Sequence, residues 1–244
     1  MLGRKIIKIE CTDSTNNYVA NLVYGGKIEN GTVILADKQT KGRGQRGAEW
    51  LSKPAENMIF SIYLTPANLS VKDQFVLTQF VSLSVVNTLK KMGLEAVIKW
   101  PNDVLINHKK IAGILIENQL TGSSISGSII GIGLNVNQTD FGTLSATSLK
   151  LETGTHFLID EFVFSLLNQL NIYWKYFENQ DYLFLKELYL NDLWLLNQKA
   201  IFIDSHGEFE GIIRGTEENG LLQLERKGEI VNYDLKEITF DYGF

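Results

Sequence analysis

Cations and glycines are concentrated in one short segment, Lys38–Gly47. Its cations are Lys38, Lys41, Arg43 and Arg46, and no carboxylate lies among them. Three glycines in the same segment let the backbone come close to a ligand and expose N–H groups. The segment therefore has the chemistry of an anion-binding loop, although a solvated basic hairpin loop would have the same composition.

The letters GRGQRG at residues 42–47 also fit GxGxxG, the pattern of a dinucleotide-binding turn. That pattern works where the glycines close a strand-to-helix turn, because the pyrophosphate sits on the helix N-terminus. A strand is expected before the loop, at Thr32–Asp37. After the loop, Pro54 and the lack of a helical apolar period argue against a helix, and the next expected element is the strand Met58–Thr65. The dinucleotide interpretation is therefore disfavoured.

A second segment, IKWPNDVLINHKKIAGILIE, places Asn102 and Asp103 just after an expected strand and Lys110 at the start of the next one. A hairpin would set Lys110 near Asp103. A lysine at the start of a buried strand is costly unless its ammonium faces a cleft or an anion. A Pro-Asn-Asp turn with surface lysines would use the same residues, so this segment alone leaves both interpretations open.

Two further segments place small or polar residues in or beside expected elements. In GIGLNVNQ, Gly131 and Gly133 indicate the close approach of a ligand or another backbone, and Asn135 could then direct its amide to a purine edge. A glycine-rich central strand is the plain alternative. In DSTN at residues 13–16, hydroxyls and an amide at a helix start can bind a polar ligand or simply cap the helix.

Strands and helices are both expected around these segments. An apolar residue recurs every four positions from Phe162 to Trp174, which predicts a helix over residues 159–178. Ser70 with Asp73 predicts a capping box for a long helix that Gly93 ends. Further helices are expected at residues 13–26 and 182–191. The expected strands are Lys5–Glu10, Thr32–Asp37, Met58–Thr65, Glu95–Trp100, Asp103–Asn107, Lys110–Gln119 and Ser124–Asn137.

This order predicts an α+β fold, with a mixed or largely antiparallel sheet and helices on one side. From Lys199 the sequence pattern changes to short expected strands separated by turn residues. We therefore expect a boundary near residue 197, which divides the chain into domains 1–197 and 198–244. The second is too small for much core of its own and is expected to lean on the first as a small β-barrel.

Composition narrows the possible roles. A formal charge of −5 argues against a general nucleic-acid or membrane-surface function. Cys11 is the only cysteine, which leaves no intrachain disulfide or cysteine-based zinc site, and His108, His156 and His206 lack metal-ligand spacing. The N-terminal residues lack the apolar core of a signal peptide, and no apolar run is long enough to span a bilayer. The cytoplasm is the expected location.

Taken in order, DSTN, QTKGRGQRGAEW, KWPND, KKIAGILIE and GIGLNVN closely resemble the biotin protein ligase family, whose members attach biotin to carboxylase subunits. The resemblance runs from about residue 5 to about residue 140 with near-matching spacing. The β-rich tail matches the family's small C-terminal domain more loosely. The resemblance implies a class II synthetase-like catalytic domain followed by an SH3-like β-barrel.

The resemblance also implies a two-step reaction. The family makes biotinyl-5′-AMP from biotin and ATP with Mg²⁺, then passes biotin to a lysine of a biotin carboxyl carrier protein. Carboxylate attack on the α-phosphate brings two anions together, so the site must supply cations and N–H donors and exclude water. By similarity, biotin is bound by Ser14, Thr15, Asn16, Gln39, Gly42, Arg43, Gly44, Gln45, Lys110 and Gly113, and ATP or the adenylate by Arg43, Trp50, Asn102, Lys110 and Asn135.

Three of these residues are expected to act in the chemistry. Arg43 would neutralise the carboxylate and phosphate oxygens from the loop, and Lys110 would hold the same oxygens from the sheet side. Asp103 would orient or deprotonate the incoming lysine, because an amine with a pKa near ~10 is a poor nucleophile until it loses its proton. The sequence does not identify the ligands of Mg²⁺.

The loop departs from the family pattern, which commonly reads GRGRRGR. Gln45 and Ala48 stand where arginines are usual. Two charge-assisted contacts are then missing, each worth roughly 1.5–3 kcal/mol when desolvated. We expect weaker closure over the adenylate and faster leakage of it, unless Lys38, Lys41 or Arg46 replaces those contacts.

Two other functions remain as alternatives: a lipoate or octanoate protein ligase, and a non-catalytic biotin-binding sensor. Lipoyl has no ureido group, so the polar DSTN segment fits biotin better. Gln45 and Ala48 would suit a sensor, whereas Arg43, Asp103 and Lys110 favour an enzyme. Since the first strand is expected at about residue 5, no DNA-binding domain and no DNA partner are expected. A monomer and a homodimer both stay open.

Overall fold

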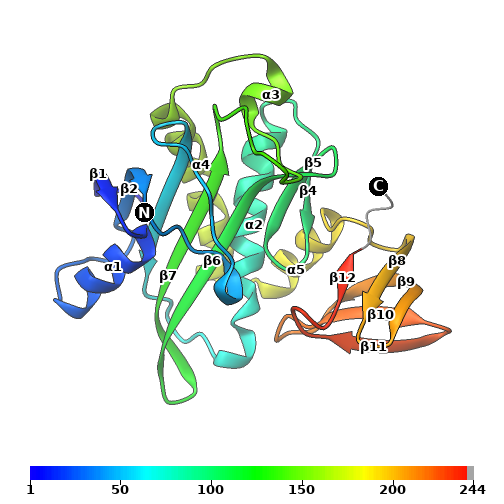
Figure 1. Ribbon diagram of the computed structural model, residues 1–244. Coiled ribbons are helices and arrows are strands. Elements are labelled where there is room, and N and C mark those ends of the chain that lie inside the picture. Colours follow the sequence, from blue (N-terminus) through cyan, green and yellow to red (C-terminus); the bar gives the residue numbers. More distant parts are fainter. Residues whose placement is uncertain (241–244) are drawn as a thin grey trace.

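A seven-stranded sheet forms the centre of the larger part of the chain (Figure 1). The computed structural model describes residues 1–240, apart from the side chain of Arg46. The strands lie in the order β1-β2-β3-β7-β6-β5-β4. The pair β1 and β2 is parallel, and every other neighbouring pair is antiparallel. The strands are β1 Ile6–Thr12, β2 Val33–Gln39, β3 Asn57–Leu64, β4 Ala96–Lys99, β5 Asp103–Ile106, β6 Lys109–Thr121 and β7 Ser124–Asn135.

Alternation along the strands gives this sheet two apolar faces. In β2, Val33 and Leu35 belong to the main core, whereas Ile34 points to the other side and packs with Val19 and Tyr63. The helices are α1 Thr15–Tyr24, α2 Phe75–Lys90, α3 Leu149–Thr153, α4 Ile159–Glu178 and α5 Tyr182–Asn191, with short 3₁₀ turns η1 Gln45–Gly47 and η2 Val71–Asp73. The expected α+β class and mixed sheet are confirmed. Helices α2, α4 and α5 share one face, and the short α1 lies on the opposite face.

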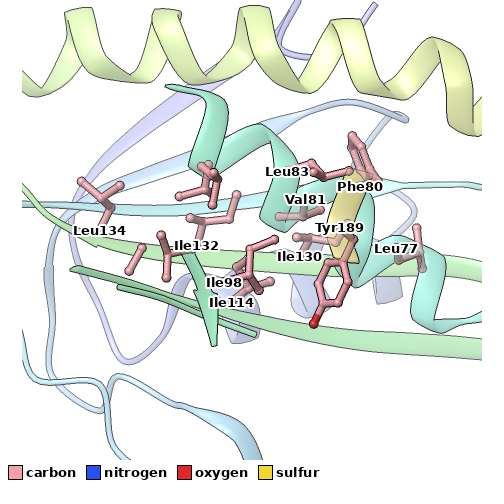
Figure 2. Packing of buried hydrophobic residues seen from close by; sticks show 14 of the residues in the cluster. Leu77, Phe80, Val81, Leu83, Ile98, Ile114, Ile130, Ile132, Leu134 and Tyr189 are labelled. Carbon is pink, nitrogen blue, oxygen red and sulfur yellow. The ribbon is translucent and has the colours of Figure 1, made fainter. Parts of the chain in front are cut away.

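Helix α2 is buried on almost every side, because α4 covers the part of its surface that faces away from the sheet. Phe80 of α2 lies 5.8 Å from the ring centre of Trp174 in α4. Figure 2 shows Leu77 and Val81 of α2 in one cluster with Ile130 and Ile132 of β7. This packing fixes β7 and β6 from behind, so their opposite face is a firm base for a site.

Helix ends differ from expectation in two places. Ser70 does begin a turn, but its Oγ accepts from the N–H of Lys72 within η2, and α2 itself starts later, at Phe75. The five-residue α3 was not expected, because so short a helix leaves no periodic pattern. Within residues 1–240, none of the helices combines the length and apolar character needed to cross a bilayer.

A second, antiparallel sheet follows with strand order β11-β10-β9-β8-β12, and it fits the expected SH3-like barrel. Its strands are β8 Lys199–Asp204, β9 Gly207–Thr216, β10 Leu222–Arg226, β11 Glu229–Tyr233 and β12 Thr239–Phe240. Its apolar residues belong to the same core cluster as α2 and the large sheet. The Nε1 of Trp100 donates to the carbonyl of Gly220 at 2.8 Å, and Trp194 stacks on Phe240. The second sheet therefore leans on the first, as expected, while the domain boundary near residue 197 stays a prediction.

Candidate active site

One cavity of about 230 Å³ lies where the basic loop crosses the face of the large sheet that carries α1. The start of α1, the end of β2, the loop, β3, β5, β6 and β7 all contribute to its wall. A turn between β11 and β12 adds Leu235 and Lys236 from the second sheet. The cavity is thus built from segments far apart in the sequence and held by the firm β6–β7 base.

Most of the residues expected to form a site meet in this cavity. Those that line it are Ser14, Thr15, Asn16, Gln39, Arg43, Gly44, Gln45, Trp50, Asn102, Asp103, Lys110 and Gly113. Gly42 and Asn135 do not line it. The four segments that the sequence analysis singled out are therefore brought to one place.

Hydroxyl and amide groups gather at the α1 end of the cavity. Gln39 Oε1 accepts from the backbone N–H of Thr15 at 2.7 Å and lies 3.1 Å from its hydroxyl. The hydroxyl of Ser61 lies 2.7 Å from Thr15 Oγ1 and 2.6 Å from Asn16 Oδ1. These buried or half-buried groups hold one another in fixed orientations, as a site for a small polar ring requires.

The start of α1 leaves the hydroxyl of Ser14 uncommitted to the helix. Ser14 is the N-cap residue, yet its side chain makes no capping hydrogen bond. Asp13 instead accepts from Asn17 Nδ2 at 2.6 Å and from the N–H of Ser14 at 2.7 Å. The hydrogen bond from Asn17, followed by that from Ser14, lowers the pKa of the Asp13 carboxyl. Plain capping therefore does not account for Ser14.

Charged groups lie along the β5–β6 side and the loop. Lys110 Nζ is 2.6 Å from Asp103 Oδ1, which confirms the juxtaposition expected from a hairpin. Lys110 Nζ also lies 5.6 Å from the ring centre of Trp50, within the range of a cation–π contact. The Arg43 guanidinium is 2.5 Å from Glu117 Oε2. Two cations, each paired with a carboxylate, thus lie at one end of the cavity.

Glycines in β6 and β7 make room for the indole of Trp50. Gly113 and Gly133 are partners across the two strands. A Cβ added at Gly133 would lie 2.3 Å from Trp50 Cε2, and one at Gly113 would lie 3.2 Å from Trp50 Cζ3. Gly131 accommodates Asn16 in the same way, since a Cβ there would lie 2.5 Å from Asn16 Oδ1. Close approach does occur at Gly131 and Gly133, but the side chains of Asn16 and Trp50 make it, not the ligand or backbone that was expected.

The indole N–H of Trp50 is buried and has no hydrogen-bond partner within the part of the chain that the structure describes. Buried donors of this kind usually meet a partner when a site is filled. Trp50 therefore lines the cavity with its indole and has one unpaired donor packed near Gly133.

The amide of Asn135 is directed at backbone carbonyls. It is buried, and its Nδ2 donates to the carbonyl of Thr147 at 2.9 Å and to that of Lys110 at 3.4 Å. Residues 145–147 pair with Lys110 and cover this end of β7. In the ligand-free chain the Asn135 amide is therefore committed to these carbonyls, and its contact with the adenylate stays a prediction. The residue fixes the backbone at Lys110.

Gly42 acts within the loop. The N–H of Trp50 donates to the Gly42 carbonyl at 3.0 Å, and a Cβ at Gly42 would lie 2.3 Å from the Trp50 carbonyl oxygen. Gly44 N–H donates to Ala48 at 2.7 Å. The loop thus folds back on itself as a narrow hairpin over the cavity. The expected compensation by Arg46 concerns a side chain outside the described part of the structure.

Sequence reasoning did not assign Glu49, Ser61, Glu117, Leu235 or Lys236, which lie at or beside the cavity. Ser61 is the one small hydroxyl residue in the buried strand NMIFSIYL, which is a signal that could have revealed it. Glu117 is a carboxylate inside a long strand of the large sheet, a second such signal. Leu235 and Lys236 lie in a turn of the second sheet. No local pattern connects that turn to the loop.

Comparisons with known proteins agree with this geometry. The model of the Biotin/lipoate A/B protein ligase family matches residues 8–135. The bifunctional ligase/repressor BirA of Bacillus subtilis is similar at 37% identity over 139 residues, a match that covers 57% of this chain and 42% of that protein. The biotin–[acetyl-CoA-carboxylase] ligase of Paracoccus denitrificans is 28% identical, with 87% of this chain and 91% of that protein covered. The biotin protein ligase of Aquifex aeolicus in complex with biotin and ATP has a similar structure, with a TM-score of 0.81 at 27% identity over 98% of this chain and 99% of that one.

Proposed function

We propose that this chain, which belongs to the biotin/lipoate A/B protein ligase family, is an ATP-dependent biotin protein ligase. One observation carries the proposal. A single cavity joins a hydroxyl–amide end at Thr15, Asn16 and Gln39 to a cationic end at Arg43 and Lys110. Biotin has the matching ends, a ureido ring with donors and an acceptor and a carboxylate.

In the first step, the biotin carboxylate attacks the α-phosphorus of ATP, forms biotinyl-5′-AMP and releases pyrophosphate. Both reactants are anionic, so the barrier falls when fixed cations and donors meet the oxygens in a site without water. Lys110 is held for this role by Asp103, and Arg43 reaches the cavity from the hairpin loop. Trp50 supplies a flat face beside Gly113 and Gly133, on which the nucleotide or the closed loop can pack.

In the second step, the amine of a lysine on the acceptor attacks the acyl carbon, and AMP leaves. The amine must first lose a proton, and Asp103 is the carboxylate placed to orient or accept from it. Its partner Lys110 would then stay on the departing AMP oxygens. We propose a biotin carboxyl carrier protein as the acceptor and the cytoplasm as the location. The oligomeric state, monomer or homodimer, stays open.

Mg²⁺ would enter this site with ATP, where it neutralises part of the phosphate charge. Glu49 and Asp103 are carboxylates of the cavity wall, and Mg²⁺ bound to substrate phosphates needs only one or two protein carboxylates. Across residues 1–240, no three His, Cys, Asp or Glu side chains come together as a metal site. The donor set therefore fits an ion held mainly by phosphate oxygens.

Exchange of label between pyrophosphate and ATP tests the first step. We expect exchange that depends on biotin and is absent without it. Exchange with lipoate in place of biotin would assign the chain to the other branch of its family. No exchange with either acid, together with measurable biotin binding, would support a sensor and overturn the enzyme.

A further inference from the structure

Glu117 of β6 joins the two ends of the cavity through one oxygen atom. Its Oε2 accepts from Arg43 Nη2 at 2.5 Å and from Asn16 Nδ2 at 2.8 Å. Asn16 belongs to the polar end at α1, and Arg43 belongs to the basic loop. The roles proposed above do not use this carboxylate.

The pairing sets the orientation of the Asn16 amide. A carboxylate only accepts hydrogen bonds, so the group that Asn16 turns to Glu117 must be its NH₂. The Oδ1 of Asn16 is then left toward Ser61, whose hydroxyl lies 2.6 Å away. Glu117 and Ser61 together fix which end of the amide lies where.

The ion pair with Glu117 also engages Arg43, which the proposed reaction needs for the substrate oxygens. While Arg43 Nη2 donates to Glu117, its charge is partly neutralised and that N–H group is not free for a substrate carboxylate or phosphate. The two side chains are 41% and 38% exposed, so water already screens the pair and the arginine can leave it at small cost. An incoming anion in a closed, drier site would be the stronger partner.

We propose that Glu117 is a positioning residue that holds Arg43 against β6 in the ligand-free chain, gives it up to the reactants, and keeps Asn16 oriented throughout. This inference rests on the proposed biotin ligase function for the identity of the anion. The hold on Arg43 itself is a property of the ligand-free protein. The two parts can therefore be tested separately.

The variant Glu117→Gln separates the two contacts. Its Oε1 still accepts from Asn16, and its size is unchanged, but the charge that attracts Arg43 is gone. Because the ligand-free state alone loses a half-exposed ion pair, biotin should bind about two- to fivefold more tightly by calorimetric titration. Glu117→Ala also removes the closer acceptor of Asn16 Nδ2 and leaves the Leu115 carbonyl at 3.4 Å, so its affinity for biotin should fall below that of Glu117→Gln.

Limited digestion with trypsin tests the hold without any ligand. Lys41 and Arg43 are cleavage sites in the loop. Ligand-free Glu117→Gln should be cut within residues 40–47 several-fold faster than the parent protein, and biotin with a non-hydrolysable ATP analogue should slow both to similar rates. Glu210→Gln is the matched control, because Glu210 forms an exposed pair with Lys199 at 2.9 Å in the second sheet. That control should match the parent in both assays.

Equal cleavage of the parent and Glu117→Gln would overturn the hold on Arg43. Weaker biotin binding by Glu117→Gln than by the parent would overturn the release, since it would mean that the carboxylate itself contacts the substrate. Loss of biotin-dependent exchange in the parent protein would reject the proposed function instead. The digestion of the ligand-free proteins would still show whether Glu117 holds Arg43.

Discussion

Asp103 and Lys110 form a pair whose members have separate tasks. The 2.6 Å contact fixes Lys110 at the start of β6, where a free ammonium beside buried strands would be costly. The carboxylate is in turn kept at the cavity wall, within reach of an amine that enters from outside. The two tasks fall in different steps of the proposed reaction, and this lets one substitution separate them.

Asp103→Asn should slow the transfer of biotin from preformed adenylate by about 10²-fold, because an amide cannot take the proton of the acceptor lysine. The experiment supplies purified biotinyl-5′-AMP and acceptor to the enzyme in a single turnover. The rate of adenylate synthesis, measured by pyrophosphate exchange, should fall less than the rate of transfer. Unchanged transfer would remove Asp103 from the second step.

Gln45 and Ala48 both line the cavity, so the missing arginines would have reached its contents. Restoring one charge with Gln45→Arg should slow the escape of biotinyl-5′-AMP by about tenfold or more, since a desolvated charge-assisted hydrogen bond is worth about 1.5–3 kcal/mol. Release can be followed after dilution into excess unlabelled biotin and ATP. Equal release rates for the two proteins would show that the loop closes without that charge.

At the scale of elements, the cavity depends on the flat surface that β6 and β7 present to the loop. That surface exists because Gly113 and Gly133 face each other across the strand pair and leave space for the indole of Trp50. The opposite surface of the same strands is packed against α2, so the strands cannot retreat. A side chain added on this face must therefore displace the loop.

Gly133→Ala should push Trp50 away from β7, because its Cβ would come within 2.3 Å of the ring. We expect a loss of about 1–3 kcal/mol in the free energy of unfolding and a weaker affinity for ATP. Chemical denaturation measures the first, and nucleotide titration the second. The double variant Gly133→Ala/Trp50→Ala should lose little more stability than Trp50→Ala alone, since the clash is then gone. Additive losses would contradict this account.

Elements with a strong local pattern were predictable, and contacts between distant elements were not. The four-residue apolar period from Phe162 to Trp174 predicted a helix over residues 159–178, and α4 is observed at Ile159–Glu178. Asn135 follows Gly131 and Gly133, and the close approach of a ligand expected there suggested that its amide could reach a purine edge. Residues 145–147 cover this residue. Nothing in β7 reveals the segment that returns over its end.

The candidate site, like the fold, was predictable only where a short sequence motif marked its residues. Four short segments identified Thr15, Arg43 and Lys110 without any knowledge of the fold. Glu117 ends the quoted segment KKIAGILIE and Ser61 lies in an apolar strand, but neither the segment nor the strand shows which side chain each residue meets. Their partners lie 101 and 45 residues away, at Asn16. Such pairs become visible only when the strand register is known.

At the scale of the whole molecule, the second sheet has a charged centre of its own. The side chain of Asp204 is only 6% exposed, and it accepts from the N–H of His206 and from Arg226, both at 2.7 Å. The hydrogen bond from His206, with further help from Arg226 and Tyr233, lowers the pKa of the Asp204 carboxyl. The charged form is therefore the one that the folded state favours.

This shift gives the stability of the protein an acid dependence. The folded pKa of Asp204 lies below the unfolded one, so the unfolded state takes up a proton first as the pH falls. The contribution of Asp204 is present above the unfolded pKa and is lost as the pH drops through the folded one. Asp204→Asn should reduce the difference in unfolding free energy between about pH 6 and about pH 3. An identical pH profile for the variant would contradict this role.

The hydrogen bond from Trp100 to Gly220 and the stacking of Trp194 on Phe240 lie within one continuous apolar cluster that unites both sheets. Heating should consequently produce a single calorimetric peak, with a van't Hoff enthalpy equal to the measured one. Truncation of the chain at residue 197 should therefore yield an aggregation-prone, poorly expressed fragment. The cut exposes the apolar surface around Phe75 and Trp100 that the second sheet covers.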